Sequence, residues 1–225
     1  MGIVVEKAKG TGSNTERKIA KKGPRPAIIT GIVDLGVQPQ SYEGVENKPC
    51  REFVPILTLV SDKNSDEEGN EYNIVTAPWP ITIKLSPKAN YIKFCKAVDP
   101  NGEVVPDGIG DIEQLIGRKV FAVMKHTKPN EEGVVYANCA GIQELPEDYP
   151  VPDVEYESVV FDTQNPDKAV FDKLWERHQK RIKGGVNYIG SNLEAVCEGG
   201  TEPNTPAPSS NQQDSRDDFD DDIPF

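Results

Sequence analysis

Aromatic rings that lie beside lysine or arginine are the residues of this 225-residue sequence that could bind a charged polymer. In RKVFAVMKH (118–126), strand alternation places Lys119, Phe121, Val123 and Lys125 on one face and Val120, Ala122 and Met124 on the other. Proteins that bind single strands without sequence preference stack bases on aromatic rings and contact phosphates with basic groups. We therefore expect a DNA platform here; the alternative is that helices cover the strand and bury Phe121.

Other segments pair aromatic and basic residues in the same way. Arg51 and Phe53 alternate on a predicted strand. Trp79 stands between two prolines at a predicted strand edge, with Lys84 nearby, and packing in the core is an equal alternative for this indole. The candidate DNA-contact residues are Arg51, Phe53, Trp79, Lys84, Arg118, Lys119, Phe121, Lys125 and Tyr136.

The chain ends with DDFDDDIPF (217–225), which suits capture by a basic pocket. Phe225 can fill an apolar pocket on a partner while its carboxylate pairs with a basic residue at the rim. Pro224 restricts the backbone and so lowers the entropy cost of binding. The aspartates attract the peptide to a positively charged surface. The alternative, an acidic segment that only improves solubility, does not explain the final Ile-Pro-Phe.

This peptide resembles the C-terminal peptide of bacterial single-stranded DNA-binding proteins, including the polar linker before it. The resemblance covers about the last twelve residues and the character of the linker, and the body looks more like the phage versions than the bacterial one. It implies that the tail binds host or phage proteins of DNA replication, recombination and repair. The residues expected to bind partners are Asp218, Phe219, Asp220, Asp221, Asp222, Ile223, Pro224 and Phe225.

Charge is distributed unevenly along the chain. The formal net charge of −12 argues at first against DNA, because neutralisation of phosphates is the main source of affinity for it. From Glu198 onward, however, eight acidic residues face only Arg216, so this stretch carries −7 of the total. The first 25 residues hold seven basic and two acidic residues, which gives +5. The acidity is therefore concentrated at the end of the chain.

The predicted elements explain how these residues would be positioned. Strands are expected at 27–35, 51–60, 71–76, 79–85, 118–126 and 134–142, with helices at 87–98 and 111–116 and a third that starts at Asn165-Pro166. Phe94, Phe171 and Trp175 lie on helical stripes and are expected in the core. The fold class is mainly β with a few helices (α+β). The order of elements is compatible with a five-stranded OB-type β-barrel with flanking helices.

Composition divides the chain into four parts. Residues 1–25 are expected to form a flexible basic arm, ended by Gly23-Pro24-Arg25-Pro26. Residues 26–197 are expected to form the OB-like, DNA-binding body. Residues 198–213 contain almost no apolar side chain and are expected to be a disordered linker before the acidic tail, 214–225. We hypothesise that the tail occupies the body's basic groove when DNA is absent, since about sixteen flexible residues reach roughly 20 to 24 Å.

Other classes of function receive less support from the sequence. There is no phosphate-binding glycine loop, and His126 and His178 are the only histidines, so we expect no enzyme and no cofactor. The four cysteines lack zinc-site spacing and are expected to be buried thiols. A cytoplasmic protein is expected, because no apolar run is long enough to span a bilayer. Two alternatives stay open: a metal-dependent nuclease built on Asp34, Glu52 and Asp111, and an adaptor that binds host replication proteins without binding DNA.

Overall fold

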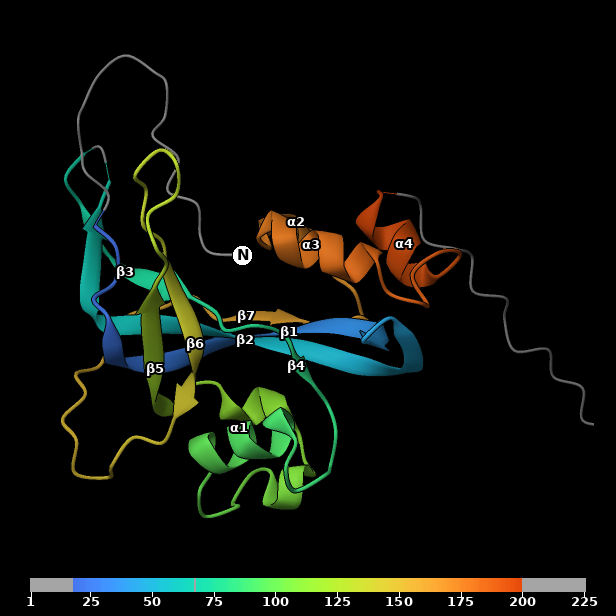
Figure 1. The fold of residues 1–225 in the computed structure, drawn as a ribbon, viewed down its shortest axis with the longest axis horizontal. Helices are drawn as coiled ribbons and strands as arrows, with labels where there is room; N and C mark the ends of the chain where they lie inside the picture. Colours follow the sequence, from blue (N-terminus) through green and yellow to red (C-terminus); the bar gives the residue numbers. More distant parts are fainter. Residues whose placement is uncertain (1–17, 67, 200–225) are drawn as a thin grey trace, which may run out of the picture.

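The computed structural model describes residues 18–66 and 68–199, and a long antiparallel hairpin lies at its centre (Figure 1). Strand β1 (Gly23–Tyr42) pairs with β2 (Val45–Ser65) from Ala27 to the turn. Glu43 and Gly44 form this turn with φ values of 50° and 80°, the two positive values that a type I′ turn requires. The predicted end of the first strand at residue 35 and the predicted start of the second at residue 51 are therefore wrong, because residues 36–42 and 45–50 continue the ladder.

The other strands extend the sheet on both sides of the hairpin. They are β3 (Glu71–Thr76), β4 (Ile81–Thr82), β5 (Lys119–His126), β6 (Ala137–Gln143) and β7 (Val159–Phe161). The main path is β3-β2-β1-β5-β6, while β4 pairs with β2 and β7 pairs in parallel with β1. The prediction of a mainly β fold with a few helices is confirmed, in the form of an open seven-stranded sheet.

Short helices cover the hairpin from two sides. They are α1 (Asn90–Val98), η1 (Pro106–Gly108), η2 (Ile112–Leu115), α2 (Lys168–Lys173), α3 (Glu176–Lys183) and α4 (Asn192–Cys197). Figure 1 shows α2, α3 and α4 on one side of the hairpin and α1 on the other. Among the described residues, no helix has the length and apolar character needed to cross a membrane.

The hairpin is buried on both faces because a helical layer lies on each. Residues 26–35 and 52–60 are buried without interruption, as the nearly continuous apolar runs in these segments require. Along β2, Phe53 and Leu57 join Tyr91 of α1 in a first core. Val54 and Ile56 point the other way, into a second core that includes residues of α2, α3 and α4. The two cores therefore share the hairpin.

Helix boundaries differ from the sequence predictions where local turns compete with the helix. The predicted start of α1 at Pro87 is wrong, because the Ser86 carbonyl accepts a hydrogen bond from the Ala89 amide at 2.8 Å and forms a turn with Pro87 in second position. The single helix expected after residue 165 is broken at Leu174 and Trp175, whose ψ angles are 148° and 140°. This break lets Leu174 enter the second core.

The start of the sheet corrects the expected end of the basic arm. Gly23, Pro24, Arg25 and Pro26 were expected to end the arm, but they pair with β5 as the first residues of β1. Proline is tolerated there because β1 has only one neighbouring strand before Ala27, so the missing N–H groups break no second ladder. Residues 1–17 and 200–225, which hold most of the predicted arm, linker and tail, lie outside the described residues.

Several smaller features complete the comparison with the sequence. Strand β3 has the predicted bounds, whereas the strand predicted at 79–85 is reduced to β4. Strand β7 and helix α4 were not predicted. Phe94 and Phe171 are core residues as expected, and Trp175 is half-buried against the second core. All four cysteines are free thiols; three are buried, and Cys50 is half-buried.

We predict that Gly31→Ala destabilises the protein by about 1–3 kcal/mol, because the new methyl group would overlap the Val159 carbonyl oxygen of β7. Gly141→Ala on β6 is the matched control, since a methyl group there meets no atom within 4 Å, and its effect should stay within about 0.5 kcal/mol. Urea unfolding of both variants measures the difference. Equal stability of the two would show that β7 does not approach β1 this closely.

Candidate nucleic-acid interface

The outward face of β5 has the alternation that the sequence predicted, but neighbouring residues cover part of it. Val120, Ala122 and Met124 are buried, and the side chains between them point outward. The Phe121 ring packs edge-on against Tyr149, with centroids 5.0 Å apart. Lys119 donates hydrogen bonds to the Asp153 carboxylate and the Val151 carbonyl, both at 3.1 Å. Residues 149–153 therefore occupy much of the expected platform.

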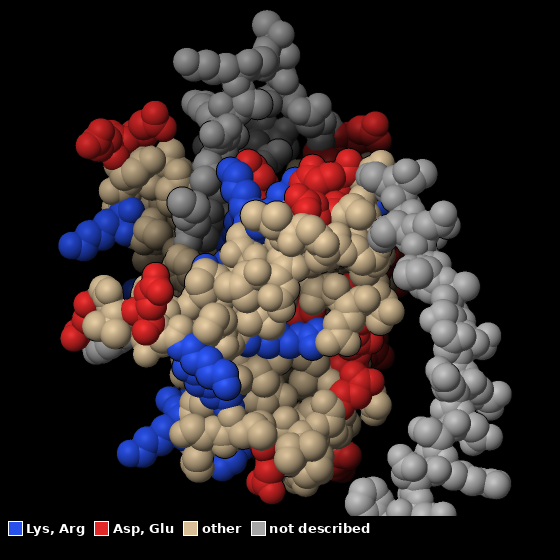
Figure 2. Space-filling model, turned by 90° about the vertical axis from the view of Figure 1, so that its right-hand side faces the viewer, with Lys and Arg blue, Asp and Glu red and all other residues tan. Residues whose placement is uncertain are grey.

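Only the basic end of this face stays open in the described residues. Lys125 is exposed, as is Lys84 in the segment after β4. Tyr136 is half-buried, and its amide donates to the Thr127 hydroxyl at 3.1 Å across the loop between β5 and β6. Figure 2 shows basic and acidic side chains interspersed on one face of the molecule, with no large field of a single sign.

Three candidates on or near the hairpin are engaged elsewhere. Phe53 is only 1% exposed and packs edge-on against Tyr91 and Phe94, so its assignment as a stacking residue is corrected: it is a core residue, because α1 covers that face of β2. Arg51 donates to both oxygens of Asp34, at 3.0 and 2.7 Å. Arg118 pairs with Glu103 at 3.0 Å and approaches Asp99 at 3.6 Å.

The carboxylates considered for a nuclease serve structural roles. Burial alone would raise the pKa of Asp34, but hydrogen bonds from Arg51 and Thr163 and from the Gly36 amide outweigh it and hold the pKa below its usual value. Glu52 pairs with Arg181 of α3, and Asp111 accepts a hydrogen bond from the Glu113 amide at the start of η2. The described residues contain no group of three or more His, Cys, Asp or Glu side chains placed to hold a metal ion.

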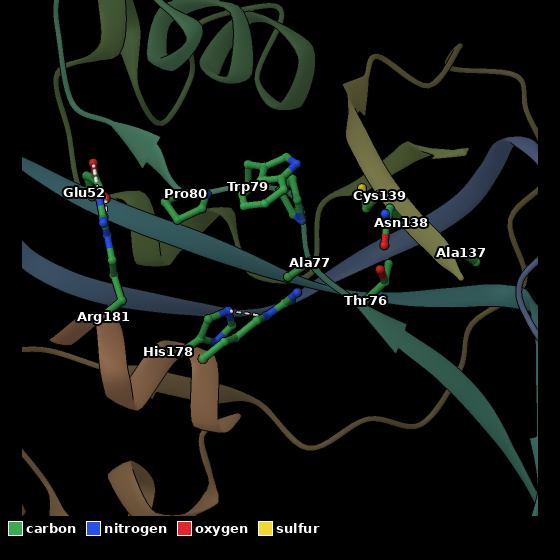
Figure 3. A pocket seen from close by; sticks show the side chains of 12 residues that line it. Glu52, Thr76, Ala77, Trp79, Pro80, Ala137, Asn138, Cys139, His178 and Arg181 are labelled. Carbon is green, nitrogen blue, oxygen red and sulfur yellow. Dashed lines mark hydrogen bonds and ion pairs between the residues drawn. The ribbon is translucent and has the colours of Figure 1, made fainter. Parts of the chain in front are cut away.

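Among the predicted DNA-contact residues, Arg51 lines a cavity of about 240 Å³ and Trp79 lines a larger one. The Trp79 side chain is 67% exposed, and it stands at the edge of a pocket of about 460 Å³. Figure 3 shows Trp79 and Pro80 on one side of this pocket, His178 and Arg181 of α3 on another, and Asn138 and Cys139 of β6 on a third. The lining residues are Glu52, Thr76, Ala77, Pro78, Trp79, Pro80, Ala137, Asn138, Cys139, Arg177, His178 and Arg181.

The local sequence explains why Trp79 is exposed. Strand β3 ends at Thr76, and the buried Ala77 anchors the following segment in the second core. Pro78 and Pro80 have no N–H group to donate, so the backbone between them cannot continue a ladder. The chain rejoins the sheet at β4, where Ile81 pairs with Phe53 of β2. The indole between the two anchor points is thereby left outside both cores.

Helix α3 forms the opposite wall and is fixed to the hairpin by an ion pair. Arg181 donates to the Glu52 carboxylate through Nε at 3.1 Å and through Nη2 at 3.0 and 2.8 Å. Glu52 is 4% exposed, so this arginine compensates a buried negative charge. Gln40 of β1 donates to the same carboxylate at 2.8 Å. The position of α3 on the sheet thus depends on a satisfied hydrogen-bond network.

One turn earlier on α3, Arg177 and His178 complete the wall. The Arg177 guanidinium lies 4.6 Å from the centre of the Trp175 ring, and its Nε donates to His178 Nε2 at 3.2 Å. Burial, assisted by the charge of Arg177, lowers the pKa of His178 to about 4, so this imidazole is neutral near pH 7. Two arginines and one glutamate therefore give the pocket a net positive charge within a negatively charged protein.

Sequence reasoning missed four of the polar residues that line the pocket: Asn138, Arg177, His178 and Arg181. They lie on β6 and α3, far in sequence from Trp79, and the only available signal was weak. Arg177 and Arg181 are four residues apart, which places them on one side of the predicted helix. The distance between this helix and Trp79 depends on the Glu52 to Arg181 pair, for which the sequence gives no indication.

The chain matches no protein-family model, and a search of curated proteins found no match. Any functional assignment therefore rests on the residues themselves.

We predict that His178 stays neutral until the pH falls to about 4, and that the protein loses folding stability as the pH approaches that value. Because this folded-state pKa lies below the unfolded value of about 6.5, the unfolded chain takes up the proton first, and stability falls as the pH drops from about 6.5 to about 4. NMR titration of the two histidines, assigned with His126→Gln, measures the pKa. His178→Gln should reduce the loss of stability in that window, and titration of His178 near 6.5 would contradict its burial.

Proposed function

We propose that this protein binds single-stranded DNA through its folded body and recruits proteins of DNA replication, recombination and repair through its acidic tail. The observation that carries the proposal is the exposed indole of Trp79 beside a pocket whose opposite wall holds Arg177 and Arg181. An exposed aromatic face and nearby arginines are what stacking on bases and contact with phosphates require. Duplex DNA keeps its bases paired and stacked, so this arrangement favours the single strand.

The topology supports the proposal that the body is a variant of the OB barrel. Five strands follow the order β3-β2-β1-β5-β6, and α1 lies in the chain between β3 and β5. An OB domain has five strands in a partly open Greek-key barrel and often has a helix between its third and fourth strands. In this variant the barrel stays open between β3 and β6, and Trp79 and Asn138 line the pocket near that opening.

The acidic tail supports the second half of the proposal. Asp217, Asp218, Asp220, Asp221 and Asp222 precede Ile223-Pro224-Phe225, which combines negative charge with an apolar end. Basic pockets on partner proteins bind such a peptide through complementary charge and a buried aromatic ring. The same aspartates compete with DNA phosphates for the arginines of the body. The tail would therefore be released for partners when DNA binds.

Binding of fluorescent oligothymidine and of matched duplex, measured across a salt series, tests the proposed function. The full chain should prefer the single strand, and its affinity should fall as salt rises, because bound phosphates release counterions. Absence of binding to the single strand at low salt, by both the full chain and a chain without residues 214–225, would overturn the proposal. The protein would then act as an adaptor that binds other proteins through its tail.

We predict that deletion of Asp214–Phe225 tightens binding to oligothymidine at low salt by on the order of tenfold, or about 1.4 kcal/mol. The gain should shrink as salt rises, because screening weakens the competition between tail and DNA. A full-length variant with the five aspartates of 217–222 changed to asparagine is the matched control, since it keeps the length of the tail and removes its charge. Both variants should bind more tightly; unchanged or weaker binding would rule out competition.

A further inference from the structure

The pocket beside Trp79 is large enough to hold more than the edge of a base. Its volume of about 460 Å³ falls within the usual range for small-molecule sites and is sufficient for one nucleotide. Its walls come from separate parts of the fold: the segment after β3, the start of β6, and α3. Because α3 belongs to the helical layer after β7, this pocket joins that layer to the sheet.

The indole at the edge of the pocket is available for stacking. Trp79 is 67% exposed, compared with 46% for Tyr72 on β3. Two anchor points hold the backbone of Trp79, since Ala77 is buried in one core and Ile81 in the other. Because the backbone is held on both sides of Trp79, only the freedom of the side chain itself is lost when a base stacks on the ring.

The pocket also suits the charge of a nucleotide. Arg177 and Arg181 carry two positive charges and Glu52 one negative charge, which pairs with Arg181 and accepts a hydrogen bond from neutral Gln40. Neutral His178 adds no charge near pH 7. A phosphate group would therefore meet a net positive wall on α3.

The lining includes buried polar atoms that have no hydrogen-bond partner among the described residues. Among them are Asn138 Oδ1, an acceptor, and His178 Nδ1, which carries the proton because Nε2 accepts from Arg177. Surrounding side chains shield both atoms, so a ligand reaches them only after the two side chains turn toward the pocket. Every nucleobase presents both a donor and an acceptor on its pairing edge, which suits one acceptor and one donor in the protein.

We propose that this pocket binds one nucleobase of the DNA strand, turned out of the base stack and placed against Trp79, with its phosphate toward Arg177 and Arg181. This inference rests on the proposed function and adds to it that α3, outside the five-strand path, forms part of the binding site. Bases on either side of the captured one would stay outside the pocket. Binding is then tolerant of sequence, because stacking on an indole accepts any base.

The first test compares Trp79→Ala with Tyr156→Ala in the full-length protein, using fluorescent oligothymidine. Tyr156 is a matched control: it is an aromatic residue with 39% exposure, and it does not line the pocket. Loss of one stacked base should weaken binding of the Trp79 variant about 5- to 140-fold, and the control should bind like the unchanged protein. Circular dichroism confirms that both variants remain folded.

The second test uses Trp79 as its own reporter. The chain has two tryptophans, so Trp175→Phe leaves Trp79 as the only one. Thymidine monophosphate should quench its fluorescence in a saturable manner, while deoxyribose 5-phosphate, which lacks the base, should not. If oligothymidine binds but Trp79→Ala matches the control and the mononucleotide does not quench, the pocket inference is wrong and the proposed function stands. If the unchanged protein binds no single strand, the proposed function fails, and the inference fails with it.

Discussion

Burial of the β1–β2 hairpin on both faces places three carboxylates inside the protein, and each needs a positively charged partner. Asp34, Glu52 and Asp62 are all buried and pair with Arg51, Arg181 and Arg25 respectively. An unpaired charge at such a site would cost several kcal/mol. Two of these pairs join β1 to β2 within the hairpin, and the third joins α3 to it. Arg181 fixes α3, Asp34 also holds Thr163 ahead of α2, and Asp62 binds the chain that leads into β1.

The candidate site is a consequence of this arrangement. The pair between Glu52 and Arg181 sets the position of α3, and one helical turn earlier Arg177 and His178 reach the pocket wall. On the other side, Pro78 and Pro80 interrupt strand pairing and leave Trp79 exposed between the buried Ala77 and Ile81. Neither wall is made by the β5 face, where Tyr149 and Asp153 already contact Phe121 and Lys119. A site of this kind joins residues about 100 positions apart.

Patterns with a short range predicted much of the fold. The alternation of β5, the bounds of β3 and the core positions of Phe94 and Phe171 all depend on local periodicity, and the structure agrees with them. The assignment of Phe53 to the DNA-binding surface was wrong, because nothing in the sequence of its strand shows that α1 covers it. The predicted start of α1 was wrong, because Ser86 begins a turn instead of capping a helix at Pro87. The pocket was not predictable beyond Trp79, since its other wall depends on an ion pair between distant residues.

Photochemical cross-linking of oligothymidine to the full-length protein, followed by mass spectrometry of the peptides, tests most directly where the strand binds. The proposed site predicts cross-links in the peptides that contain Trp79, residues 137–139 and residues 177–181, since these segments surround the pocket. Cross-links confined to the outward face of β5, around Phe121 and Lys125, would contradict it and restore the platform that strand alternation first indicated.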